Sequence, residues 1–141
     1  MKMNMLQNIK NKIFLRYCKA SCNHTAEGKS FVNFQKARSV LIFFESDPDE
    51  INTEIKNIIK DLKDSGKNVM AIGLVDKKII ESPELYDFQL FNLKNFDWKG
   101  KPNAGLISLI QKSEYDWVID LSVRPILPIQ YMLMFSKSRF R

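Results

Sequence analysis

Histidine and cysteine are almost missing from this chain. Its 141 residues include one histidine, His24, and two cysteines, Cys18 and Cys22. A Ser-His or Cys-His nucleophile would have to recruit His24 from a polar segment outside the predicted fold, which argues against conventional hydrolase chemistry. Two cysteines make no disulfide framework in a chain of this length. These three residues lack a fourth ligand at structural-zinc spacing, so we expect no metal and no cofactor.

Long apolar runs are missing as well. A membrane-spanning helix needs roughly 20 consecutive apolar residues, and no stretch of the sequence approaches that length. The first turns are interrupted by Gln, Asn and Lys, so they form no apolar core of a signal peptide. Together with the scarcity of cysteine, this predicts a cytoplasmic protein.

Glycine is missing from the turn in which a nucleotide-binding protein needs it. The first predicted strand is followed by Asp47, Pro48, Asp49 and Glu50. A phosphate group at the start of a helix requires free backbone amides and a glycine for close approach. Three carboxylates occupy that position instead and repel phosphate. The sequence therefore excludes a dinucleotide fingerprint and a P-loop at this turn.

Positive charge is concentrated at the two ends of the chain. Residues 1–20 hold five basic side chains and no acid, and residues 137–141 hold three more, whereas residues 21–136 hold 14 basic and 16 acidic side chains. A nucleic-acid-binding domain needs basic residues clustered on its folded face, so we expect no nucleic acid partner. We divide the chain into a basic helical arm (1–20), a linker (21–30) and a single α/β domain (31–141).

The arm has the spacing of an amphipathic helix. Leu6, Ile9, Ile13 and Tyr17 recur at steps of three or four, with lysines and an arginine elsewhere around the helix. Three arrangements remain open for it, and we rank them in the order given. The arm docks on its own domain, pairs with another chain, or lies on an anionic membrane surface.

Strands and helices alternate through the rest of the sequence. We predict strands at 39–45, 68–75, 87–93 and 116–121, with helices starting at 47–50, after Asn103 and near Pro128. The second helix of the chain carries an isoleucine and leucine stripe and ends at Gly66. The pattern predicts a three-layer, Rossmann-like α/β sandwich with a mostly parallel four-stranded sheet in the order 3-2-1-4. The last residues, from Lys137, look like the lead into a fifth strand in a longer chain.

Polar residues gather where the first and fourth predicted strands end. In an open parallel sheet, ligands bind beyond the carboxyl ends of the strands where the winding direction reverses. Two carboxylates facing each other there suit a divalent cation or a division of acid and base roles. Structural roles such as helix capping explain the same residues. The candidate ligand-binding residues are Glu45, Ser46, Asp47, Asp120, Ser122 and Arg124.

Two functions follow as hypotheses. The first is a non-catalytic module for protein interaction or self-association, which contacts its partner through the basic arm or a sheet edge. The second is a small enzyme or ligand-binding domain that uses the polar residues at the strand ends. We prefer the first, because neither a histidine nor a glycine-rich turn accompanies those residues.

The segment 31–44, with its Asn33-Phe-x-x-Ala37-x-Ser39 pattern, and the segment 115–128 resemble a family of small bacterial proteins of unknown function. The resemblance covers most of the chain. It implies a basic N-terminal helix and a Rossmann-like body that continues past Arg141, and it implies no activity.

A weaker similarity links 115–122 and 138–141 to the N-terminal half of heptosyltransferase-like glycosyltransferases. The Gly-Asp loop of those enzymes is replaced by Glu45, Ser46, Asp47 and Pro48, and their donor half is absent. This similarity therefore implies a related fold and no transferase activity.

Overall fold

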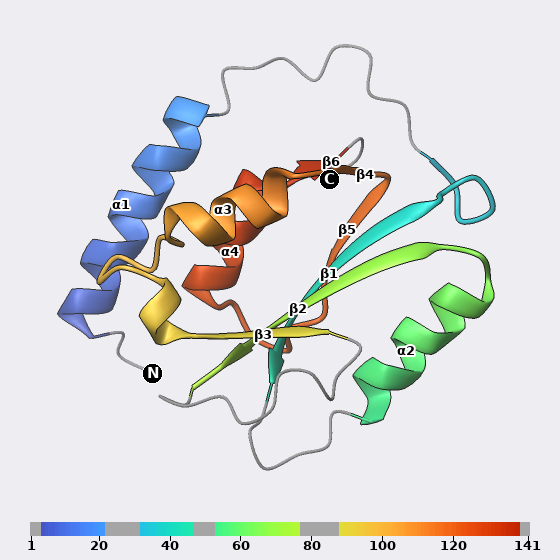
Figure 1. Ribbon diagram of the computed structural model, residues 1–141. Helices are drawn as coiled ribbons and strands as arrows, with labels where there is room; N and C mark the ends of the chain where they lie inside the picture. The colour runs from blue at the N-terminus through green and yellow to red at the C-terminus, as the bar shows by residue number, and fades with distance from the viewer. Residues whose placement is uncertain (1–3, 22–31, 47–52, 77–87, 139–141) are drawn as a thin grey trace.

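The computed structural model describes residues 4–21, 32–46, 53–76 and 88–138 (Figure 1). The predicted helix start at 47–50 lies outside these residues. The helices are α1 (Met5–Ser21), α2 (Thr53–Asp64), α3 (Ala104–Gln111) and α4 (Leu127–Phe135), with a short 3-10 helix η2 (Leu93–Asn95). The strands are β1 (Ser39–Ser46), β2 (Asn68–Val75), β3 (Gln89–Asn92), β4 (Glu114–Tyr115), β5 (Trp117–Asp120) and β6 (Lys137–Ser138).

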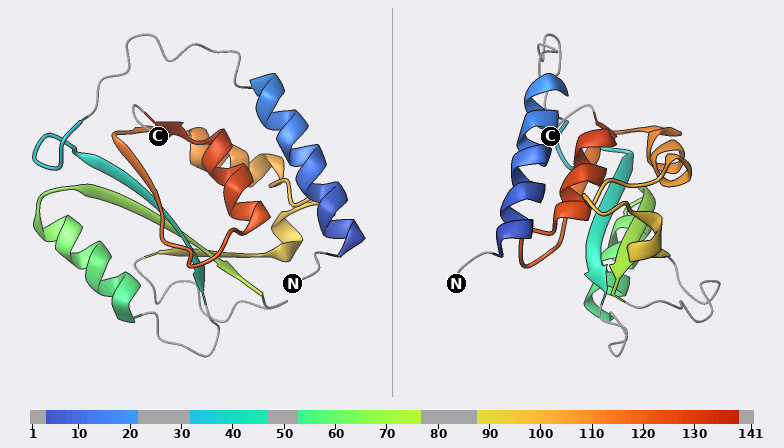
Figure 2. Two further views of the ribbon diagram at one scale, coloured as in Figure 1. Left: turned by 180° about the vertical axis from the view of Figure 1, so that it is seen from behind. Right: turned by 90° about the vertical axis from the view of Figure 1, so that its left-hand side faces the viewer.

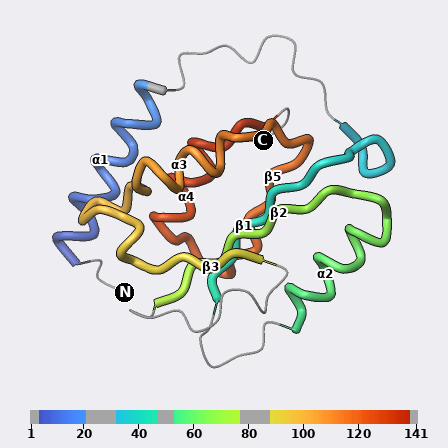
Figure 3. The backbone as a smooth tube through the Cα atoms, in the orientation of Figure 1, coloured from blue at the N-terminus to red at the C-terminus, as the bar shows by residue number. Residues whose placement is uncertain are grey.

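The main sheet has the predicted strand order. Its four strands lie in the order β3-β2-β1-β5, and β5 is the fourth strand of the prediction. Every neighbouring pair is parallel, with Phe43 of β1 opposite Ile72 on one side and Asp120 on the other. The chain path in Figure 3 shows β1 flanked by strands on both sides. The predicted parallel α/β sheet is confirmed.

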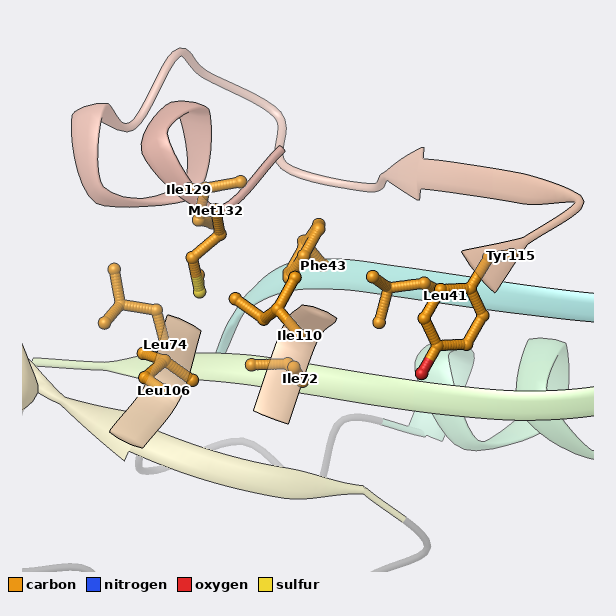
Figure 4. Packing of buried hydrophobic residues seen from close by; sticks show 9 residues of the cluster. All are labelled: Leu41, Phe43, Ile72, Leu74, Leu106, Ile110, Tyr115, Ile129 and Met132. Atoms are coloured by element: carbon orange, nitrogen blue, oxygen red, sulfur yellow. The ribbon is translucent and has the colours of Figure 1, made fainter. Parts of the chain in front are cut away.

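Strand β1 is covered on both faces because its apolar residues are consecutive. Leu41 and Phe43 join a buried cluster with residues of α3 and α4 (Figure 4). Val40, Ile42 and Phe44 point to the other face, where Ile59 of α2 packs against them. Alternation along a strand sends successive side chains to opposite faces, so one apolar run supplies both halves of the core. The helices on the two faces make the three predicted layers.

Buried polar groups fix the starts of the strands. The Asp116 carboxylate accepts hydrogen bonds from the backbone N–H groups of Arg38 (2.7 Å) and Ser39 (3.2 Å). Lys67, which is buried, donates from Nζ to the carbonyl oxygens of Phe34 and Ala37. Both side chains form hydrogen bonds to backbone groups just before and at the start of β1. These backbone groups therefore have partners although the segment packs against the core.

Local signals at the helix ends behave as predicted. Asn103 caps α3, because its Oδ1 accepts a hydrogen bond from the Leu106 backbone N–H at 2.9 Å. Gly66 adopts a φ of 80° just after α2. This left-handed conformation favours glycine and ends the helix.

The residues from Lys137, predicted to lead into a fifth strand, begin with the short strand β6, which does not add to the main sheet. β6 pairs in parallel with β4 in a separate two-stranded sheet. The backbone N–H of Asp116 then bonds to the Ser39 carbonyl oxygen at 3.1 Å. The chain therefore changes neighbour at Asp116, from β6 before it to β1 after it.

Helix α1 docks on α4, the first of the three predicted arrangements. Figure 2 shows the two helices side by side in both views. The Phe14 and Tyr131 rings meet edge to face with centroids 4.7 Å apart, and Tyr17 contacts Phe135 at 5.8 Å. The Cys18 sulfur lies 3.6 Å from the Met134 sulfur. The docking face therefore includes Phe14 and Cys18, which lie outside the stripe seen in the sequence.

Alanine substitutions at two glycines, one in a crowded position and one in an open position, test the packing of the sheet. A Cβ atom at Gly73 would lie 2.7 Å from side-chain atoms of both Phe44 and Leu90. We expect Gly73→Ala to lower the free energy of unfolding by about 1–3 kcal/mol through overpacking. Gly105→Ala in α3 is the control, since a Cβ atom there would lie 3.6 Å from Asn103 Oδ1, an ordinary contact distance. Urea denaturation should show Gly105→Ala unchanged or stabilised by up to about 1 kcal/mol; equal effects would contradict this packing.

Candidate functional site

The carboxyl ends of β1 and β5 meet at the point where the sheet reverses its winding. β2 and β3 lie on one side of β1, and β5 lies on the other. Glu45 and Ser46 end β1, while Asp120 ends β5 and leads to Ser122 and Arg124. This is the place at which ligands bind in open parallel sheets. The structure therefore brings five of the six predicted residues to one edge, and Asp47 lies outside the described residues.

Glu45 and Arg124 form a bidentate ion pair across the two strand ends. Arg124 Nη2 lies 2.5 Å from Glu45 Oε1, and its Nε lies 3.2 Å from Oε2. Hydrogen bonding to Glu45, followed by the attraction of its charge, raises the pKa of Arg124. The Arg124 side chain remains 70% exposed, so the pair holds the loop after β5 in position more than it adds stability.

The two carboxylates of the site that the structure describes are both engaged by neighbouring groups. Glu45 is engaged by Arg124, and the exposed Asp120 accepts a hydrogen bond at Oδ1 from the Ser122 backbone N–H at 2.9 Å. Ser46 is 4% exposed. Among the described residues, no three His, Cys, Asp or Glu side chains gather in a way that could hold a metal. The arrangement suits recognition of a polar group more than acid–base chemistry.

Ser122 has a hydroxyl group at this end of the sheet that is unsatisfied within the described part of the chain. Its Oγ is buried and has no hydrogen-bond partner among the residues that the structure describes. A buried hydroxyl without a partner costs free energy, and native structures contain few of them. Among the described residues, the hydroxyl is therefore an unsatisfied polar group beside the other candidate residues.

A groove that the sequence analysis missed begins at Arg124. It has a volume of about 930 Å³ and lies between α1, the segment from η2 to Gly100 and the loop from β5 to α4. Its apolar lining includes Phe14, Leu15, Phe96 and Ile126. Most of these residues come from segments far apart in sequence, so no local pattern could have indicated the groove.

Trp98 also lines this groove. It stands in the loop between η2 and α3 and is 61% exposed. The carboxylate of Asp97 holds the loop, because it accepts hydrogen bonds from the backbone N–H groups of Lys99 (2.8 Å) and Lys101 (3.0 Å). Gly100 closes the turn with a φ of 89°. An aromatic side chain is thus presented to solvent on an ordered turn.

The parallel sheet with helices on both faces defines a Rossmann-like α/β protein. The chain belongs to a family of unknown function, DUF6913, whose model matches residues 10–141. The resemblance to a family of unknown function is therefore confirmed.

The chain has no match among curated proteins and none among solved structures. The similarity to heptosyltransferase-like glycosyltransferases accordingly has no support. None of the helices within the described ranges is long and apolar enough to cross a bilayer.

The buried hydroxyl gives a stability test of this edge. Ser122→Ala removes a polar atom that has no partner among the described residues, so we expect the free energy of unfolding to rise by up to about 1 kcal/mol. Urea denaturation measures the change, with Ser108→Ala on the exposed side of α3 as a matched control. Destabilisation specific to Ser122→Ala would mean that the hydroxyl already has a partner.

Proposed function

We propose that this protein is a non-catalytic interaction module and that one face of α1 binds a protein partner with an acidic surface. The observation that carries the proposal is the way α1 docks. It uses Phe14, Tyr17 and Cys18 against α4 and leaves its other side uncovered by the described residues.

The uncovered face of α1 is both apolar and basic. Met5 is 77% exposed, Leu6 50% and Ile9 43%. Apolar side chains that gather in this way on a surface are typical of interaction sites. The exposed cations on the same helix are Lys12, Arg16 and Lys19, and residues 5–21 contain no acid.

Charge favours an acidic partner over a second copy of this chain. Two α1 helices packed face to face would bring like charges together, which opposes association. A membrane surface would neutralise the cations, but Met5, Leu6 and Ile9 are few apolar side chains to insert and would bury little area. An acidic protein surface with an apolar centre satisfies both features.

The state of the polar edge also supports a binding role. Glu45 is held by Arg124, and Asp120 bonds to the backbone of its own loop. A general acid or base needs a carboxylate free to reach a substrate proton.

A photo-crosslinking residue at Ile9 tests the proposed face in intact cells. We expect an adduct with one protein of defined mass, and we expect its yield to fall at least about fivefold in Lys12→Glu/Arg16→Glu through charge repulsion. The same crosslinker at Lys60 of α2, on a face of mixed charge, should give no such adduct. Mass spectrometry of the purified adducts identifies what is attached.

Other outcomes of this experiment decide against the proposal. Adducts with lipid would indicate a membrane surface, and adducts with a second copy would indicate self-association. An adduct whose yield survives the charge reversal would mean that the basic residues do not select the partner. Asp120→Asn should leave the yield unchanged.

A small-ligand role at the strand ends is the second candidate. The observation that favours it is the buried Oγ of Ser122, which has no partner among the described residues. If this role is correct, Asp120→Asn or Ser122→Ala will abolish binding of the small ligand, and Lys12→Glu/Arg16→Glu will not affect it.

A further inference from the structure

We propose that the groove beside Arg124 binds a small amphiphile with an anionic head group and an apolar tail. This site is separate from the uncovered face of α1, because Lys10 and Phe14 line the groove while Lys12 and Arg16 lie on the exposed side of the helix. Binding to this groove can therefore be tested independently of the proposed protein partner.

The groove has the size and lining of a ligand site. Its volume of about 930 Å³ lies within the usual range for pockets that hold small molecules. Three of its lining residues are large, apolar and strongly exposed: Leu15 at 56%, Leu93 at 52% and Trp98 at 61%. They belong to α1 and to the segment from η2 to Gly100, so two separate segments turn apolar surface toward the groove.

Trp98 is placed for binding before any ligand arrives. Asp97 accepts hydrogen bonds from two backbone N–H groups of its turn, and its own N–H donates to the Lys101 carbonyl oxygen at 2.9 Å. Phe96 and Pro102 form an antiparallel bridge at the base. An ordered loop loses little conformational freedom when a ligand covers its aromatic ring, which favours affinity.

The charges lining the groove favour an anion. Lys10, Asp97 and Arg124 are its charged lining residues. Asp97 is already occupied by its turn and by Lys99, whose Nζ lies 3.8 Å from Oδ2. Lys10 is half-buried and forms no ion pair among the described residues. Arg124 is engaged by Glu45 but has further N–H donors, since a guanidinium carries five.

The separation of these features selects the shape of the ligand. The cations come from α1 and from the loop after β5, while the strongly exposed apolar residues come mainly from η2 and the turn at Trp98. A head group and a tail joined in one molecule match both parts. A purely apolar ligand would leave Lys10 desolvated without a partner, at a cost in affinity.

Titration of the full chain with dodecanoate, kept below its micellar concentration, tests the site. Trp98 is largely exposed, so covering its ring should shift its emission to shorter wavelength. The emission of Trp117 should not change, because this residue does not line the groove. Its Nε1–H donates instead to the Val32 carbonyl oxygen at 2.7 Å. Trp98→Phe should abolish the spectral shift while calorimetry still detects heat of binding.

Lys10→Glu and Lys12→Glu form a matched pair. They make the same change of charge two residues apart, which places them on opposite sides of the helix. We expect Lys10→Glu to weaken dodecanoate binding at least about tenfold and Lys12→Glu to change it less than about twofold. Dodecyl phosphate should bind as well, whereas acetate, which lacks a tail, and dodecyl maltoside, which lacks a charge, should bind at least about tenfold more weakly.

Three results would overturn the proposal. The first is no binding of dodecanoate or dodecyl phosphate to the folded wild-type chain. The second is equal loss of affinity in Lys10→Glu and Lys12→Glu, with circular dichroism showing both folded. The third is equal binding of dodecyl maltoside, since the cations would then select nothing. If Lys10→Glu does not fold, the affinity of Lys10→Gln for the same ligands is measured in its place.

Discussion

The packing of β1 on both of its faces is the constraint on which the rest of the structure depends. Each residue from Val40 to Phe44 is at most 1% exposed. Covering one face needs α3 and α4, and covering the other needs α2. Each neighbour, β2 and β5, is then held by the hydrogen bonds of the same strand. The reversal point at the end of β1 exists because strands must lie on both sides of it.

Most of this architecture could be predicted from the sequence, because local patterns determine it. A continuous apolar run indicates a strand buried on both faces, and Gly66 and Asn103 mark helix ends through their backbone preferences. The strand order is that of a doubly wound parallel sheet, which the alternation of strands and helices favours. The same reasoning placed Glu45, Ser46, Asp120, Ser122 and Arg124 at one edge. It could not give the Glu45–Arg124 pair, since the conformation of the loop after β5 decides which carboxylate the arginine reaches.

Features that arise from contacts between distant segments were not predictable. The docking face of α1 is set by the aromatic side chains of α4, which offer edge-to-face partners to Phe14 and Tyr17. Periodicity within α1 alone favoured Leu6 and Ile9, which the structure leaves exposed. Residues from Lys137 were expected to lead into a further strand, but the pairing of β6 with β4 depends on the change of neighbour at Asp116. The groove combines three such segments, so no local pattern indicates it.

The burial of β1 has a further consequence for the unfolded chain. Five consecutive apolar residues with high strand propensity, and without proline, glycine or charge, are the kind of segment that nucleates cross-β aggregates. In the native state its backbone is paired on both edges and its side chains are covered, so the hazard exists only during synthesis and after local opening. Arg38 and Glu45 stand on either side of the run, where charges oppose stacking of identical segments. The strand that organises the fold is thus also the one that must be covered earliest as the chain folds.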